Sequence, residues 1–246
     1  MVTMIAVREA IRSLNDLRTK SNLKQTEDDR FFTEWYEDLP PITEAEKKAL
    51  DLIKQRYDYH RAASPLLEGT INLVVISPLL EVAGFLDPPF QVRSPESIEL
   101  VIEDPDQTII RGLIDVLVVR SGFWVLVVES KRTSIPVTAA LPQILAYMLA
   151  NSEREQPTYG VATNGDSFIF IKLSRSERSQ YDISDAFLLL PRHNRFYEVL
   201  QILKRLSQIK PQSYIVNSII KILELTSPIK TRASFFPAII PQSEWH

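Results

Sequence analysis

The stretch that decides the fold runs from Arg111 to Lys131 and reads RGLIDVLVVRSGFWVLVVESK. Two apolar runs rich in valine, 111–119 and 123–131, are separated by the short segment 120–122. Runs of this kind, bounded by a turn signal, are typical of strands that are buried on both faces. The sequence therefore predicts a hairpin of two buried strands at the centre of a sheet.

Charged residues lie where these strands should be buried. Asp115 interrupts the first run, and Glu129 and Lys131 end the second. A carboxylate in apolar surroundings is costly unless it is paired or bound to a metal. Because residues two apart on a strand share a face, Glu129 and Lys131 point the same way, and Ser130 points the other way. The pattern favours a metal site, and the alternative is a buried ion pair with Lys131.

The turn decides whether Asp115 joins Glu129. A two-residue loop at 121–122 would pair Asp115 with Val128, and Glu129 would then lie on the opposite face. We therefore predict a three- or five-residue connection, or a bulge that corrects the register. Two carboxylates and the backbone carbonyl of Ser130 would form a site of hard oxygen ligands suited to Mg²⁺, with Mn²⁺ as a substitute.

Helices and further strands are predicted on both sides of this hairpin. The N-terminal 25 residues suggest one amphipathic helix. Periodicity, capping and turn signals predict the other elements: a helix over 43–59, a helix over 67–83 kinked at Pro78, a strand over 97–103, a helix over 138–149, a hairpin of strands 159–163 and 167–173, and C-terminal helices with apolar stripes at 196–206 and 215–223. This order predicts an α/β (α+β) fold with a mixed central sheet flanked by helices.

The expected organisation has four parts: a helical extension (1–42), a catalytic core (43–175), a helical C-terminal part packed on the core (176–226) and an extended tail (227–246). This division follows the change from helical to alternating periodicity and back.

Composition excludes several classes of protein. The 246 residues include no cysteine, which rules out disulfide frameworks and thiol chemistry. No apolar run approaches the roughly 20 residues that span a bilayer, and the N-terminus does not read as a signal peptide, so we expect a cytoplasmic protein without a membrane partner. There is no GxxxxGK[ST] phosphate loop, so no ATP is expected.

The charge is unevenly distributed. The net charge is −3, with ten acidic and five basic residues over 27–60, but two acidic and eight basic residues over 191–232. A basic end on an acidic chain suits a phosphate backbone, although a solvated helix face explains it equally well. Our candidate DNA contacts are Arg132, Lys204 and Arg205.

A family resemblance appears once Gln143 and Tyr147 are added. They lie four residues apart, on one face of the predicted helix. Asp115, then Glu129-Ser130-Lys131, then Gln143 and Tyr147 resemble the D…ExK…QxxxY signature of RecB-like members of the PD-(D/E)xK nuclease superfamily. The segments 68–85 and 163–165 are similar to the nuclease domain of the R (HsdR) subunits of type I restriction enzymes. The resemblance covers roughly residues 60 to 175.

The resemblance implies a restriction-endonuclease-like fold and a Mg²⁺-dependent DNA endonuclease that leaves 3′-hydroxyl and 5′-phosphate ends. It also implies that Asp115 and Glu129, with the Ser130 carbonyl, bind the metal, and that Lys131 orients the attacking water or offsets charge in the transition state.

Three further roles follow from the same resemblance. Glu68 would be an acid carried by a helix near the metal, with Glu81 as a weaker alternative; an ordinary first-turn glutamate is the other interpretation. Gln143 and Tyr147 would position Lys131 or a phosphate oxygen, or simply pack the helix.

The chain departs from the restriction subunit because it has no room for a helicase motor after Leu173. A stand-alone nuclease module is therefore expected. The rival hypothesis is a non-catalytic DNA-binding or partner-docking protein that keeps the fold. A homodimer is a further expectation, because cutting two strands requires two active sites.

Overall fold

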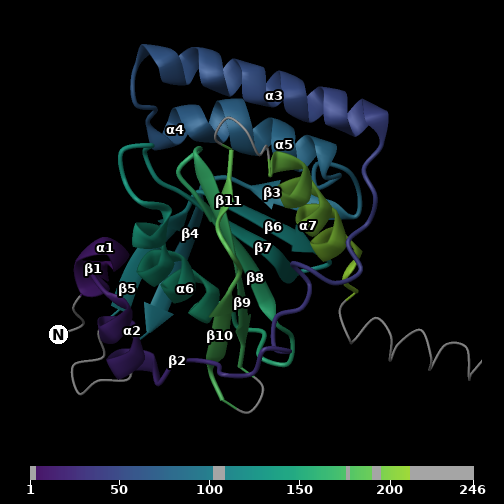
Figure 1. Ribbon diagram of the computed structural model, residues 1–246. Helices are drawn as coiled ribbons and strands as arrows, with labels where there is room; N and C mark the ends of the chain where they lie inside the picture. The colour runs from purple at the N-terminus through teal and green to yellow at the C-terminus, as the bar shows by residue number, and fades with distance from the viewer. Residues whose placement is uncertain (1–3, 102–108, 176–177, 190–194, 211–246) are drawn as a thin grey trace, which may run out of the picture. The chain divides into compact units, whose positions relative to one another are not determined.

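The valine-rich strands lie inside an eight-stranded mixed sheet (Figure 1). The computed structural model describes residues 4–101, 109–175, 178–189 and 195–210. The sheet has the order β2-β10-β9-β8-β7-β6-β3, and β11 pairs with β9. The strands are β2 (Lys24–Gln25), β3 (Phe90–Arg93), β6 (Val116–Arg120), β7 (Phe123–Ser130), β8 (Thr158–Thr163), β9 (Ser167–Ser174), β10 (Gln180–Ile183) and β11 (Phe187–Leu188).

Three other strands form a separate sheet of order β1-β5-β4: β1 (Met4–Ala6), β4 (Glu96–Val101) and β5 (Ile109–Ile114). The prediction of one strand over 111–119 was therefore wrong. The chain leaves the small sheet after Ile114 and enters the large sheet at Val116, because the two halves of the run pair with different neighbours. Asp115 lies at this crossing point.

The hairpin between β6 and β7 reaches the predicted register through a bulge. Its turn is a two-residue loop, in which Ser121 has φ 52° and Gly122 has φ 86°. Such angles suit the tight turns that join antiparallel strands. The register shifts between Val118 and Val119, and Val116 then pairs with Val128. Continued by one residue, this register places Asp115 opposite Glu129, so the bulge alternative is confirmed.

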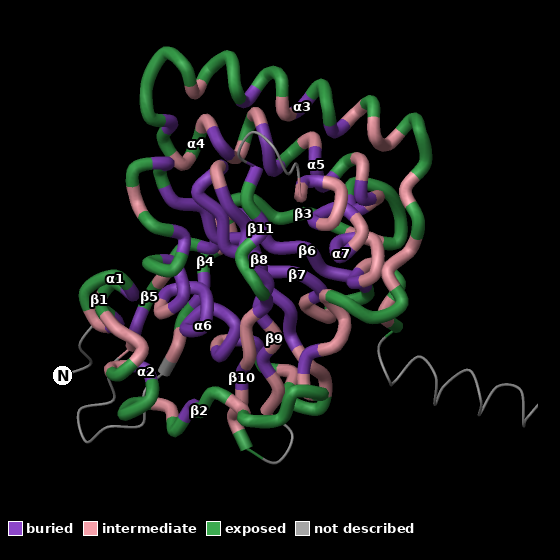
Figure 2. The backbone as a smooth tube through the Cα atoms, viewed as in Figure 1, coloured by how far each residue is buried: buried purple, intermediate pink, exposed green. Residues whose placement is uncertain are grey.

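One face of the large sheet is covered by helices: α3 (Glu44–Ala63), α4 (Glu68–Ile71), α5 (Ser77–Val82) and α7 (Phe196–Gln208). Alternate residues of β6, Val116 and Val118, belong to the core on this side. Helix α3 begins at the predicted capping box of Thr43 and Glu46. It forms an outer layer over α5, and its outer side is exposed (Figure 2).

The other face of the large sheet packs against α6 (Leu141–Leu149), which continues a 3₁₀ turn at Val137–Ala140. Leu117 and Val119 of β6 belong to the core on this side. A sheet covered on both faces requires uninterrupted apolar strands, which explains the two valine runs. The structure is a mixed sheet flanked by helices, so the predicted α/β (α+β) fold class with a mixed central sheet is confirmed.

The N-terminal segment differs from the prediction of a single helix. It contains β1, α1 (Val7–Ala10) and α2 (Leu14–Ser21). Ser13 and Asp16 form a capping box that starts α2 as a new helix. Strand β1 pairs with β5, which lies about a hundred residues later. This long-range pairing outweighs the local helical pattern.

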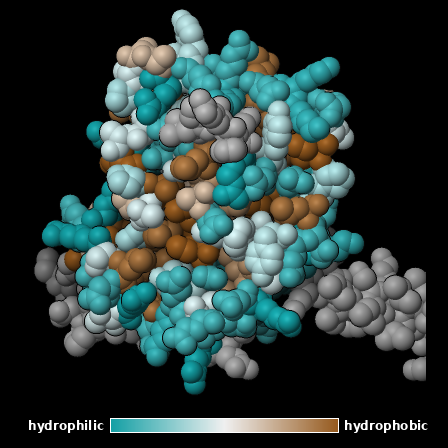
Figure 3. Space-filling view, viewed as in Figure 1, coloured by the Kyte–Doolittle hydropathy of each residue, from teal (hydrophilic) through white to brown (hydrophobic). Residues whose placement is uncertain are grey.

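The helix predicted over 67–83 is interrupted as expected near Pro78. Helices α4 and α5 are joined by a π-helical segment, η1 (Asn72–Ile76), and Pro78 lies in the first turn of α5. Leu50 of α3 is buried, whereas Leu52 is 45% exposed. Hydrophilic side chains cover most of the α3 region in the space-filling view (Figure 3).

Some expected features lie outside the described residues: the apolar stripe at 215–223, the tail at 227–246 and the end of the strand over 97–103. Among the residues that the structure describes, no helix combines the length and the apolar content that crossing a membrane requires.

Candidate active site

Asp115 and the end of β7 meet as the sequence predicts. The backbone N–H of Ser130 donates a 2.7 Å hydrogen bond to Oδ2 of Asp115. Burial raises the pKa of Asp115, and the hydrogen bond from Ser130 and the charge of Lys131 oppose this rise. Asp115 therefore lies directly beside the Glu-x-Lys segment and is only partly shielded from solvent.

Glu129 is an acidic residue whose side chain is completely buried. Its side chain is 0% exposed, and Oε1 accepts a 2.5 Å hydrogen bond from Nζ of Lys131. Its other oxygen, Oε2, is buried without a hydrogen-bond partner among the described residues. Burial and the nearby charge of Asp115 raise the pKa of Glu129 to about 8, although Lys131 opposes this. A buried acceptor without a donor is costly, and this oxygen is therefore a candidate metal ligand.

Lys131 continues into a chain of buried polar side chains. Its Nζ donates to Oε1 of Gln143 at 2.7 Å, and Nε2 of Gln143 donates to the hydroxyl of Tyr147 at 2.6 Å. Burial and the charge of Glu129 raise the pKa of Tyr147 to about 12. Gln143 and Tyr147 lie on α6, which packs against β7, the strand that ends directly before Lys131. The structure thus brings together the residues of the Glu-x-Lys and Gln-xxx-Tyr pairs.

Gly112 makes room for Tyr147. A Cβ atom at Gly112 would lie 2.4 Å from Cε1 of Tyr147 and 2.9 Å from Cγ2 of Val7. Real contacts are never this short, so α6 and the N-terminal segment approach β5 closely only because residue 112 lacks a side chain.

Glu68 begins α4 and faces the same region. Its charge raises the pKa of Asp115, although burial has the larger effect. Nη2 of Arg8 lies 3.7 Å from Oε2 of Glu68. Sequence reasoning missed Arg8, because only the pairing of β1 with β5 brings it here. No local signal marks it among the other basic residues of the N-terminus.

Ser130 directs its side chain away from the carboxylates, as the strand geometry predicts. Its hydroxyl hydrogen-bonds to Oδ1 of Asn72, which lies in η1. Sequence reasoning did not identify Asn72. Its position four residues after Glu68 is the only signal, because both residues follow the same helical path. Short π-helical segments often occur near functional sites.

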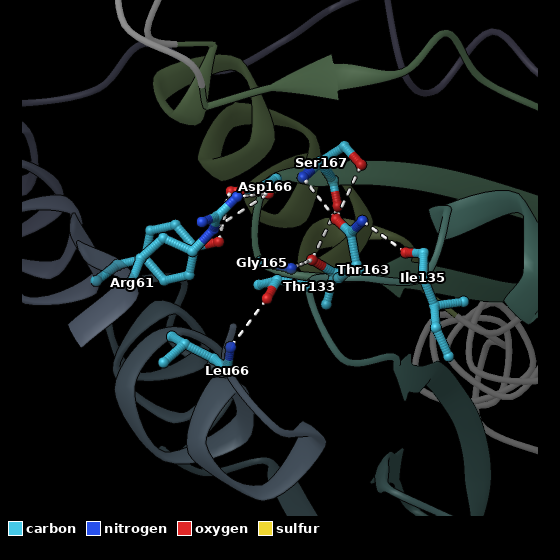
Figure 4. A network of polar contacts seen from close by, with 10 residues as sticks. Arg61, Leu66, Thr133, Ile135, Thr163, Gly165, Asp166 and Ser167 are labelled. Atoms are coloured by element: carbon cyan, nitrogen blue, oxygen red, sulfur yellow. Dashed lines mark hydrogen bonds and ion pairs between the residues drawn. The ribbon is translucent and has the colours of Figure 1, made fainter. Parts of the chain in front are cut away.

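Hydrogen bonds to two other segments of the chain hold the loop that follows Lys131 (Figure 4). The hydroxyl of Thr133 accepts from the N–H of Leu66 at 2.9 Å, and the Thr133 N–H donates to the Leu66 carbonyl at 3.1 Å. Nδ2 of Asn164 donates to the Ile135 carbonyl at 2.8 Å. These contacts connect the Glu-x-Lys strand to the start of α4 and to the turn after β8.

That turn is the predicted Thr-Asn-Gly hairpin. The Thr163 hydroxyl accepts from the N–H of Gly165 at 3.0 Å, and Gly165 has φ 85°. Asp166 completes the turn and forms an ion pair with Arg61 at 3.0 Å, and it accepts a hydrogen bond from Tyr57 (Figure 4). The turn is therefore fixed to α3, and its role is structural support.

The candidate DNA contacts are dispersed. Arg132 is exposed beside Lys131. On α7, Lys204 forms a 2.6 Å ion pair with Glu46, and Arg205 lies 3.9 Å from Asp38. Neither α7 residue lines the pocket of about 980 Å³ that reaches Asp115 and Tyr147. Glu81, the weaker alternative to Glu68, lines a different pocket.

The donor set fits a hard cation. Among the described residues there is no group of three or more histidine, cysteine, aspartate or glutamate side chains that could hold a metal ion. Asp115 and Glu129 nevertheless offer two carboxylates, and Oε2 of Glu129 lacks a partner in the described structure. Mg²⁺ sites in proteins commonly use one or two carboxylates and fill the other positions with water or phosphate oxygens.

No model of a known protein family matches the chain, and no curated protein matches it. Among solved structures, the chain is similar to a fragment of a protein described as an HsdR subunit of a type I restriction enzyme from Vibrio vulnificus, with 19% identity and a TM-score of 0.36. The match covers 61% of this chain and 27% of that chain.

Proposed function

We propose that the protein is a metal-dependent deoxyribonuclease of the PD-(D/E)xK superfamily. One observation carries the proposal: Glu129 is fully buried, has one oxygen without a partner among the described residues, and lies beside Asp115 and Lys131. A protein that needed only a stable core would gain from an apolar residue at this position.

Asp115, Glu129 and the backbone carbonyl of Ser130 would hold Mg²⁺, with Mn²⁺ as a substitute. Bound there, the cation would stabilise negative charge on a phosphate and lower the pKa of a coordinated water. Binding would also give Oε2 of Glu129 the partner that it lacks in the described structure.

Lys131 would orient the attacking water or offset charge that develops on the phosphate. Gln143 supports this role, because its carbonyl oxygen accepts from Nζ and holds the ammonium group beside Glu129. Tyr147 accepts from Gln143 and fixes the amide orientation. Glu68, at the start of α4, would accept hydrogen bonds from metal-bound waters.

The proposed substrate is DNA, with Arg132, Lys204 and Arg205 as backbone contacts. A homodimer would place two such sites on one duplex. Product ends would be 3′-hydroxyl and 5′-phosphate, as in the family that the motifs resemble.

The test is cleavage of linear and circular DNA with Mg²⁺ or Mn²⁺. We expect cleavage by the wild type and loss of at least about a hundredfold in Asp115→Asn and Lys131→Gln. Glu34→Gln is the matched control, because Glu34 is a mostly buried acid paired with Lys172 at 2.6 Å. Glu34 also accepts a hydrogen bond from the hydroxyl of Tyr159, which lies near the start of β8, whereas Thr163 ends that strand.

Full cleavage by both site variants would show that the site is misplaced. DNA binding by the wild type without cleavage under any metal condition would instead support the rival hypothesis of a non-catalytic DNA-binding protein.

A further inference from the structure

A groove beside the three-stranded sheet leads to the candidate site. It has a volume of about 980 Å³ and is lined by residues of β1, α1, β4 and β5. Asp115 and Tyr147 lie along the same groove. Asp115 is therefore approached from the side of the N-terminal segment.

The groove has a floor that remains accessible to solvent. Ser97, Glu99, Arg111 and Leu113 alternate along β4 and β5, and all four are exposed. Leu113 is 56% exposed, whereas Ile110 and Ile114, on the opposite face of β5, are buried. Mixed polar and apolar walls suit a nucleotide chain, which carries charged phosphates and apolar sugar and base surfaces.

Two arginines line this groove, and only one is tightly paired. Arg111 is bound to Glu99, with Nε at 2.8 Å and Nη2 at 2.7 Å from the same oxygen. Arg8 lies 3.7 Å from Glu68, and its side chain is 62% exposed. Strong charge-assisted hydrogen bonds are about 2.7–2.9 Å long. Arg8 is therefore loosely held and can take an anionic partner, whereas Arg111 is already occupied.

The position of Arg8 is determined by packing. Strand β1 pairs in parallel with β5, so that Ala6 aligns with Arg111, and Val7 contacts the surface of Gly112. Val7 is 1% exposed. The buried side chain of Val7 and the pairing of β1 with β5 thus place the next residue, Arg8, in the groove. Its charge opposes the rise in the pKa of Asp115.

We propose that Arg8 contacts a phosphate of the DNA strand that occupies this groove, adjacent to the phosphodiester bond cleaved at Asp115 and Glu129. The inference rests on the proposed function and extends it, because it makes the N-terminal segment part of the substrate site. The planar guanidinium group suits bidentate binding of a phosphate.

The experiment measures binding of a fluorescent duplex oligonucleotide in EDTA, as Kd over a range of salt concentrations. Four proteins are compared: wild type, Arg8→Gln, Arg8→Lys and Arg12→Gln. Arg12 is the matched control, because it is exposed on the same segment and does not line the groove. Loss of one phosphate contact should lower the slope of log K against log salt by about 0.9.

We expect Arg8→Gln to bind about tenfold more weakly with the lower slope, Arg8→Lys to keep the wild-type slope, and Arg12→Gln to match the wild type. Equal affinity and slope in Arg8→Gln and wild type would overturn the inference. So would a loss of affinity with an unchanged slope that Arg8→Lys does not restore, because that pattern indicates structural damage.

The proposed function and this inference fail in different ways. A wild type that binds DNA and cleaves it with Mg²⁺, together with an Arg8→Gln variant that binds equally well, removes only the role of Arg8. A wild type that neither binds nor cleaves DNA removes both.

Discussion

The carboxylate of Asp115 accepts a hydrogen bond from the backbone N–H of Ser130, and this 2.7 Å contact joins the crossing point between the two sheets to the end of β7. A backbone donor cannot move far without breaking the strand. The contact therefore holds Asp115 next to Glu129 before any ligand binds, which is the preorganisation that an active site requires.

Gly112→Ala should disturb both the fold and the site, because the added Cβ would lie 2.4 Å from Tyr147 and 2.9 Å from Val7. We expect a loss of about 1–3 kcal/mol in the free energy of unfolding. Urea denaturation measures it. Gly69→Ala is the control, because an added Cβ there meets nothing within 4 Å and alanine favours a helix. Equal stability of the two variants would contradict the packing described for Tyr147.

Gln143→Leu should slow DNA cleavage without a comparable change in KM. The substitution removes the acceptor of Lys131 and the donor to Tyr147, so the ammonium group loses its fixed position. We expect kcat to fall about 10- to 100-fold, as is common for a supporting residue. Steady-state cleavage assays give both constants. Tyr147→Phe, which keeps the ring, should have a smaller effect; a larger effect than Gln143→Leu would show that the hydroxyl acts directly.

The pair of Glu34 and Lys172 should make stability depend on pH. Burial raises the pKa of Glu34, but hydrogen bonds from Lys172 and Tyr159 and the charge of Lys172 outweigh it, so the pKa lies below the ordinary value of 4.5. A lowered pKa means that the stabilisation is fully present above the unfolded pKa and is lost as pH falls through the folded pKa.

Urea unfolding of wild type and Glu34→Gln from pH 7 to pH 3 tests this pair. The wild type should be more stable by about 1.5–3 kcal/mol at neutral pH, the usual value for hydrogen bonds to a charged group. The difference should shrink below pH 4.5. A difference that stays constant over the range would show that the charge of Glu34 contributes nothing.

The sequence predicts the central hairpin and its acids because the information is local. A carboxylate within valine runs that are covered on both faces is costly unless it is paired or bound to a metal, so the acids stand out in the sequence. The i to i+2 spacing of Glu129 and Lys131 places both side chains on one face of the strand. The helix carrying Gln143 and Tyr147 follows from periodicity alone. The same reasoning narrowed the register to a few alternatives, and a bulge proved to be the one used.

The missed features depend on contacts between distant segments. Strand β1 has only three residues and is stabilised by pairing with β5, so its local pattern favours a helix instead. Arg8 reaches the site through that pairing. The split of the run 111–119 at Asp115 likewise depends on which neighbours each half finds, and no local pattern encodes the choice.

The central claim is that Asp115 and Glu129 share one divalent cation, and isothermal titration of the purified protein with Mn²⁺ tests it most directly. We predict one Mn²⁺ bound per chain in the wild type and in Glu34→Gln, and loss of binding in Asp115→Asn. No binding by the wild type, or equal binding by Asp115→Asn, would contradict the account.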